Sequence, residues 1–156
     1  MTKELFLILL ANGHDELVKT FKATPDNKLN WKPFENGRSI LELFSEAANT
    51  CQMTQEFVAS RALEMPSYEK YQELTAASAG WSREEALAAM ETNYTALVKA
   101  FEPVTDVELS TPIPSAAPDD LSEAFGVWGM MPYRTFVSRF AQINYIQTLY
   151  GDTDSH

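Results

Sequence analysis

Hydrophobic residues recur at the spacing of an α-helix in four separate stretches of the chain. These stretches predict helices over residues 2–23, 39–63, 82–102 and 132–150. Each predicted helix carries an apolar stripe, which is buried when the helices pack against one another. The pattern therefore predicts an all-α protein built as one four-helix bundle.

Local start signals support three of these helices. Ser39 and Glu42 have the spacing of a capping box, and so do Ser82 and Glu85. Pro132 suits the first turn of the last helix, where its missing N–H costs nothing. These signals mark the residue at which each of the three helices is expected to begin.

The segments between the helices are less regular. Residues 64–80 are ambiguous: Tyr68–Leu74 could form a short helix, and Ala76–Gly80 has the small residues of a linker. Residues 103–128 contain Pro103, Pro112, Pro114 and Pro118, which exclude a continuous helix or a central strand. Asp119–Phe125 could form a turn of helix. A connection this long predicts a crossover along the bundle before the last helix.

Length and charge limit the function classes. The chain has 156 residues, and we expect one domain over residues 1–151 followed by a polar tail over residues 152–156. Its net charge is −10 and its Lys and Arg residues are scattered, which disfavours nucleic-acid partners. The apolar run at residues 5–11 is too short to span a membrane, and we expect no membrane association. Cys51 is the only cysteine, so we expect a cytoplasmic protein without disulfides.

Two charged residues interrupt the apolar stripes. Glu46 lies inside the apolar arc of the second helix, and Arg139 lies between Phe136 and Ile143 in the stripe of the fourth. The solvated face of the second helix is expected to consist of Glu42, Ser45, Asn49, Gln52 and Glu56. A buried Arg keeps its proton and is costly without a partner, so we expect the two side chains to pair inside the bundle. Thr135, Gln142 and Thr50 are expected to complete the hydrogen bonds. The alternative is that both side chains extend along their helices to water.

The residues offer little for metal or nucleophilic chemistry. The only histidines are His14 and His156, and no His-x-x-x-His or Cys pair is present, so the usual ligands for zinc or iron are missing. Neither a Ser-His-Asp arrangement nor a phosphate-binding loop occurs. His14 has no evident partner that would make it a general base. We therefore expect no metal and no cofactor.

Three short motifs occur in order along the chain: Trp31-Lys32-Pro33, the run Gly37-Arg38-Ser39-Ile40-Leu41-Glu42-Leu43, and Gln142-Ile143-Asn144-Tyr145-Ile146 followed by Gly151. In this combination they resemble the DinB-like (DinB/YfiT) superfamily. The resemblance covers most of the chain and implies a four-helix bundle with an up-down-down-up path. It also implies a homodimer formed through helix faces.

The resemblance also implies a location for a site. Many members hold a divalent metal with three histidines, and those positions fall on Glu46, Thr135 and Arg139 of this chain. None of the three is a histidine, so the resemblance implies a degenerate metal site. Two of these residues, Glu46 and Arg139, are the ones that interrupt the apolar stripes, and Thr135 is one of those expected to complete their hydrogen bonds.

Three functional hypotheses follow. The first is a binding or interaction protein that takes a small molecule and does not use metal catalysis. The second is an enzyme of the thiol-dependent transferase or hydrolase type, in which Glu46 is the acid or base and Arg139 anchors an anionic substrate. The third is a purely structural dimer module.

Overall fold

The computed structural model describes residues 2–61, 67–113, 124–154 and 156. Over these residues the protein is helical and forms no extended strand, which confirms the all-α class. The helices are α1 (Lys3–Ala23), η1 (Asp26–Lys28), α2 (Ile40–Ser60), α3 (Tyr68–Ser78), α4 (Arg83–Phe101), α5 (Asp106–Ser110), α6 (Phe125–Gly129) and α7 (Met131–Leu149). No helix in these ranges combines the length and the apolarity needed to cross a membrane.

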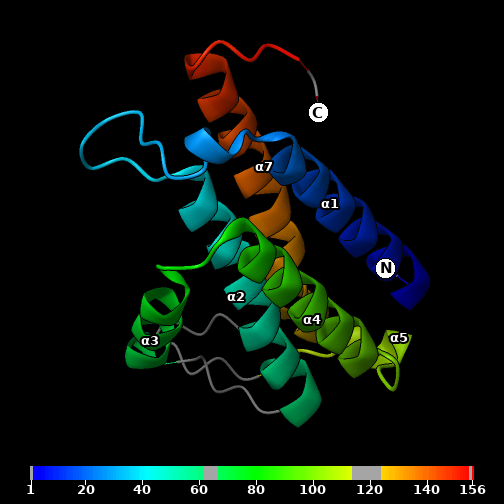
Figure 1. The fold of residues 1–156 in the computed structure, drawn as a ribbon. Helices are drawn as coiled ribbons and strands as arrows, with labels where there is room; N and C mark the ends of the chain where they lie inside the picture. Colours follow the sequence, from blue (N-terminus) through cyan, green and yellow to red (C-terminus); the bar gives the residue numbers. More distant parts are fainter. Residues whose placement is uncertain (1, 62–66, 114–123, 155) are drawn as a thin grey trace.

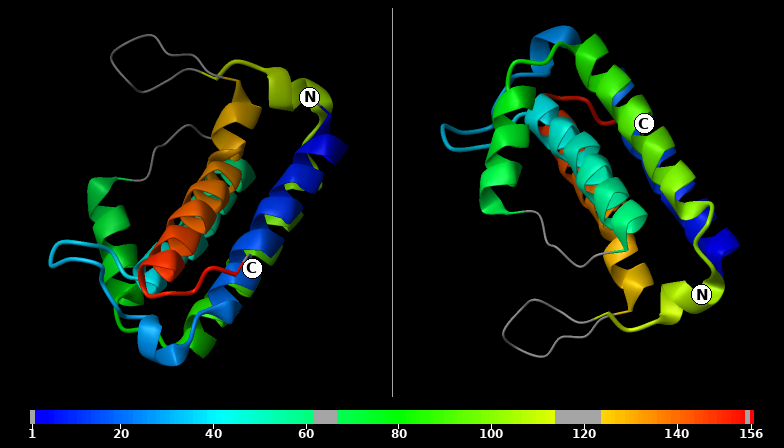
Figure 2. Two further views of the ribbon diagram at one scale, coloured as in Figure 1. Left: turned by 90° about the horizontal axis from the view of Figure 1, so that it is seen from above. Right: turned by 90° about the horizontal axis from the view of Figure 1, so that it is seen from below.

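Four long helices form the bundle, in the order α1, α7, α2 and α4 around its axis (Figure 2). In Figure 1, α1 and α7 run upward while α2 and α4 run downward. Contacts between helix ends agree with these directions. The ring of Phe6 at the start of α1 lies 4.6 Å from that of Phe101 at the end of α4, and Thr20 near the end of α1 hydrogen-bonds Gln147 near the end of α7.

The predicted apolar stripes form the core. Ile40, Phe44 and Cys51 of α2 are fully buried, as the helical spacing predicted. Burial raises the pKa of the Cys51 thiol, which makes this residue a small buried hydrophobe and not a reactive nucleophile. His14 is also buried, and its ring stacks on Tyr94 at 3.8 Å. Packing therefore accounts for this histidine.

The helix starts follow the predicted caps, but one end differs. Both capping boxes form, at Ser39 with Glu42 and at Ser82 with Glu85. The prediction that the second helix reaches Leu63 is wrong, because α2 ends at Ser60 and the next residue, Arg61, adopts a left-handed backbone conformation with φ of 56°. Residues 62–66, which follow this end, lie outside the described residues.

The helix α3 corrects two predictions. It continues to Ser78, through most of the stretch predicted to be a linker. It also lies against α2, on the face predicted to be solvated (Figure 1). Ser45 and Asn49 of that face are consequently buried, and the Asn49 amide donates hydrogen bonds to the Leu74 carbonyl (3.2 Å) and to the Ser78 hydroxyl (3.1 Å).

The crossover before the last helix contains two short helices that were not predicted. The helix α5 begins with a third capping box, formed by Thr105 and Glu108, and α6 leads directly into α7. Most of the helical turn predicted over Asp119–Phe125 lies outside the described residues, and α6 begins only at its last residue.

Candidate functional site

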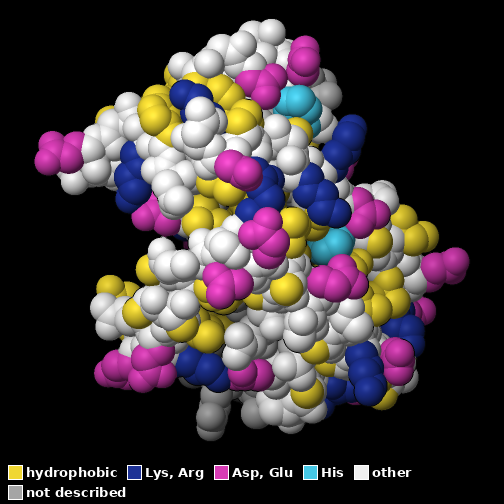
Figure 3. All heavy atoms as spheres, in the orientation of Figure 1, with side chains coloured by type: hydrophobic (Ala, Val, Ile, Leu, Met, Phe, Trp, Pro, Cys, Tyr) yellow, Lys and Arg dark blue, Asp and Glu magenta, His cyan; other side chains and the backbone are white. Residues whose placement is uncertain are grey.

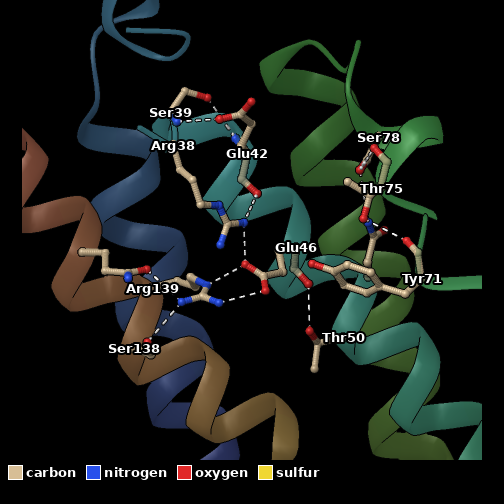
Figure 4. A network of polar contacts seen from close by, with 12 residues as sticks. Arg38, Ser39, Glu42, Glu46, Thr50, Tyr71, Thr75, Ser78, Ser138 and Arg139 are labelled. Carbon is tan, nitrogen blue, oxygen red and sulfur yellow. Dashed lines mark hydrogen bonds and ion pairs between the residues drawn. The ribbon is translucent and has the colours of Figure 1, made fainter. Parts of the chain in front are cut away.

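Glu46 of α2 and Arg139 of α7 form a bidentate ion pair between the two helices (Figure 4). Arg139 donates from Nε to Glu46 Oε2 at 2.7 Å and from Nη2 to Oε1 at 2.8 Å. Each side chain is 18% exposed. This parallel two-point geometry is the strong form of the guanidinium–carboxylate contact, because both oxygens and both nitrogens are used.

A second guanidinium contacts the same carboxylate. Arg38 directly precedes the N-cap residue of α2, and its side chain extends along the first turns of that helix. Its Nη2 lies 2.5 Å from Glu46 Oε2 (Figure 4). The same nitrogen also lies 3.4 Å from the Glu42 carbonyl. Glu46 is thus held by one cation from the bundle interior and one from the loop, and the cluster carries one net positive charge.

The positions of Glu46 and Arg139 along their helices bring the two charged groups together. The capping box at Ser39 fixes where α2 starts, and Glu46 lies two turns further on, between the buried Ser45 and Ala47. Arg139 projects toward it because its neighbours in the stripe of α7, Phe136 and Ile143, are both buried. Glu46 and Arg139 therefore meet where α2 packs against α7.

The surroundings of Glu46 set its pKa. Burial raises the pKa of its carboxyl, but hydrogen bonds from Arg139 and Arg38 and their positive charges lower it, and the net direction is below the usual value. Glu46 is therefore ionised at neutral pH and has no proton to donate as an acid.

The remaining predicted site residues divide into two groups. Gln142 joins the cluster, because its Oε1 accepts a hydrogen bond from Arg139 Nη1 at 2.8 Å. Thr50 lies outside it and donates its hydroxyl to the Glu46 backbone carbonyl at 2.8 Å. Thr135 is half-buried one turn before Arg139, and in the part of the chain that the structure describes no hydrogen bond joins it to the pair.

A pocket of about 680 Å³ opens beside Glu46, between the loop before α2, α2 itself and α3. Figure 3 shows the surface hollowed between this loop and α3. Most of the residues that line it are of polar types, and the lining comprises Asn30, Lys32, Asn36, Gly37, Arg38, Ser39, Leu41, Glu42, Ser45, Glu46, Asn49, Tyr71, Thr75, Ser78 and Ala79. The Ser45 hydroxyl is buried and has no hydrogen-bond partner within the described residues.

Sequence reasoning missed three residues of this site. Arg38 lies in a loop, where no helical period shows which way a side chain points. Ser45 was assigned to a solvated face because the covering helix α3 was not predicted in full. Tyr71 lies on α3 itself and points toward α2 (Figure 4). The clearest available signal was the placement of Arg38 directly before a capping serine, within reach of the first turns of α2.

Comparison with known proteins identifies the family. A sequence profile described as the DinB superfamily matches residues 9–131. The chain belongs to the DinB superfamily. None of the curated proteins matches the chain.

Two solved structures show the same fold as this DinB-superfamily chain. One is an uncharacterised protein from Escherichia coli UTI89, with a TM-score of 0.72 and 13% identity over 94% of this chain and 93% of that one. The other is a mycothiol-dependent maleylpyruvate isomerase, with a TM-score of 0.71 and 13% identity over 92% of this chain. A mutant of that isomerase gives a TM-score of 0.69. The chain spans only 61% of the isomerase.

The residues at the positions implied for the family metal do not fit a divalent ion. Glu46 offers one carboxylate whose oxygens are both engaged, Thr135 offers a neutral hydroxyl, and Arg139 places a permanent cation at the third position. Among the described residues no group of three or more His, Cys, Asp or Glu side chains is placed to hold a metal. We therefore derive no chemistry through a metal at this site.

Proposed function

We propose that this DinB-superfamily chain binds a small molecule in the pocket beside Glu46 and does so without metal catalysis. The observation that carries the proposal is that two guanidinium groups hold the Glu46 carboxylate while an open, polar pocket borders it. A pocket of about 680 Å³ falls in the size range of small-molecule sites.

The electrostatics support the metal-free part of the proposal. A guanidinium cannot lose its proton in a protein, so Arg139 keeps its charge at any working pH. A divalent cation in contact with Glu46 would have to displace both arginines or lie beside them, and like charges at such distances repel strongly in a partly buried site. Binding of Glu46 to arginine is therefore in direct competition with binding to a metal.

Elemental analysis tests this part. The native protein is purified without chelator from cells supplied with zinc, nickel and iron, next to a variant with Glu46→His, Thr135→His and Arg139→His. We expect the native protein to contain far less than one metal ion per chain and the variant to gain metal. Stoichiometric metal in the native protein would reject the proposal.

A ligand screen tests the binding part. Thermal unfolding is measured with a library of small polar molecules, and a true ligand raises Tm in a concentration-dependent way. We expect stabilisation of the native protein that is lost when the pocket is filled by Ser78→Phe. A screen that stays blank throughout would favour the structural dimer module instead.

A second candidate is an enzyme that works in the same pocket. It is favoured by the exposure of Glu46 to the pocket and by the likeness in fold to a mycothiol-dependent isomerase. The lowered pKa of Glu46 argues against an acid role, so this enzyme would use Glu46 as a base after Arg38 moves away. Thiol-dependent isomerisation or hydrolysis by the native protein, abolished in Glu46→Gln, would establish this candidate.

A further inference from the structure

The charged residues that line the pocket balance, and Arg139 behind them adds a positive charge, although the chain as a whole is acidic. Lys32 and Arg38 line it and Arg139 lies behind Glu46, giving three positive charges, while Glu42 and Glu46 give two negative ones. The local balance is one net positive charge in a chain with a net charge of −10. A cation excess confined to one pocket of an acidic protein attracts small anions to that point.

Both carboxylates of the pocket are already neutralised. Glu42 Oε1 lies 2.7 Å from Lys32 Nζ, and Glu42 Oε2 accepts the backbone N–H of Ser39 at 2.7 Å. Glu46 is held by Arg38 and Arg139. Neither acid therefore offers a free face to a cationic ligand.

Unused donors line the pocket. Arg38 uses only Nη2 in its contacts with Glu42 and Glu46, and its Nε and Nη1 have no hydrogen bond within the described residues. The side chain is 44% exposed, so these groups are accessible from solvent. Ser45 adds an independent observation: the residue lines the pocket and is 2% exposed, and its hydroxyl has no partner within the described residues. A buried hydroxyl in this state is costly unless a bound group satisfies it.

We infer that this pocket binds a small organic anion, whose carboxylate or phosphate group is held by Arg38 with Lys32 beside it and whose body extends toward Ser45 and Tyr71. The inference rests on the proposed small-molecule function and adds the chemical class of the ligand. The guanidinium of Arg38 suits both oxyanions, because its free Nε–H and Nη1–H groups can each donate a charge-assisted hydrogen bond to an oxygen of the ligand.

Isothermal titration calorimetry at low ionic strength tests the inference, with succinate and inorganic phosphate as anionic probes and succinamide as the neutral match for succinate. The variants are Arg38→Met, Lys32→Met and, as a matched control, Arg134→Met, which removes an exposed arginine of α7 that does not line the pocket. Circular dichroism confirms that each variant is folded.

We expect the native protein to bind at least one of the two anions and Arg38→Met to bind it about tenfold more weakly or worse, since a charge-assisted contact is lost. Lys32→Met should weaken binding less, and Arg134→Met should match the native protein. Binding of succinate alone identifies a carboxylate ligand, and binding of phosphate alone identifies a phosphoryl ligand.

Two results would overturn the inference. One is failure of both anions to bind the native protein, and the other is equal affinity in Arg38→Met and in the native protein. If succinamide binds as tightly as succinate, the pocket is a small-molecule site but the anion class is wrong, and the proposed function stands. Stoichiometric metal in the native protein would reject the proposed function whatever the anions do.

Discussion

Two polar clusters join α7 to its neighbours, and they are built in opposite ways. One is neutral: Gln147 donates to the Thr20 carbonyl at 3.1 Å and to the Thr24 hydroxyl at 3.2 Å, and the Thr20 hydroxyl lies 2.9 Å from Asn144 Oδ1. Thr20 and Gln147 are at most 1% exposed. The other is the charged Glu46–Arg139 pair, which is partly exposed and borders a pocket.

The difference separates a structural role from a functional one. In the neutral cluster the Gln147 amide has partners for both of its polar atoms inside the protein, so the cluster fixes the register of α1 against α7 and has nothing to offer a ligand. The charged cluster leaves donors of Arg38 unused and lies near the unpartnered hydroxyl of Ser45. A binding site differs from a purely structural contact because polar groups beside its cavity are left without hydrogen-bond partners.

The largest effect is expected from Arg139→Met. It removes the bidentate partner of a mostly buried carboxylate, and with Arg38 still in contact we expect a loss of about 2 kcal/mol in the free energy of unfolding, measured in urea. The exposed Arg134→Met serves as control and should change stability by less than about 0.5 kcal/mol. The double variant Glu46→Met, Arg139→Met should recover much of the loss, and a double variant that loses as much as the two single variants combined would contradict this account.

A smaller effect is expected from Gln147→Met in the neutral cluster. The replacement has similar volume but removes three hydrogen bonds to the buried Thr20 and Thr24, which keep their bonds to Asn144 and to each other, and this should cost about 1–2 kcal/mol. The exposed Gln72→Met is the matched control. Anion affinity in the titration described above should be unchanged in Gln147→Met, and a fall in that affinity would show that the two clusters are not separate in function.

The smallest effect on stability is expected from Ser45→Ala. In the free protein the change removes a buried hydroxyl that has no partner, so stability should stay within about 0.5 kcal/mol of native or rise slightly. The same change should weaken anion binding, because the proposal places the body of the ligand toward this hydroxyl. A clear loss of stability would mean that Ser45 has a structural partner in solution and would remove it from the proposed site.

The comparison also shows which features the sequence could predict. The helices, their caps and the inward positions of Glu46 and Arg139 follow from periodicity, because in a helix the face of each residue is fixed by its number. The contribution of Arg38 could not be predicted in this way, since it comes from a loop where side-chain direction depends on tertiary contacts. The burial of Ser45 could not be predicted either, because α3 covers it. The helix α3 has few buried residues and therefore a weak periodic pattern.

Some of the missed structure did have a local signal. Thr105 and Glu108 have the same capping-box spacing as the two boxes that were recognised, and they begin the short helix α5. Proline content in the surrounding segment outweighed that signal. Capping-box spacing between prolines therefore indicates a short helix even where the prolines exclude a long one.

The most direct test of the central claim is the titration of the Glu46 carboxyl carbon by NMR, with the resonance assigned by its absence in Glu46→Gln. Because the pKa is lowered in the folded state, Glu46 contributes stability at neutral pH, and this contribution is lost as the pH falls through the folded pKa. We predict a midpoint below 4.5, the ordinary value, shifting upward in Arg139→Met. A midpoint at or above 4.5 in the native protein would contradict the claim that two arginines hold this carboxylate.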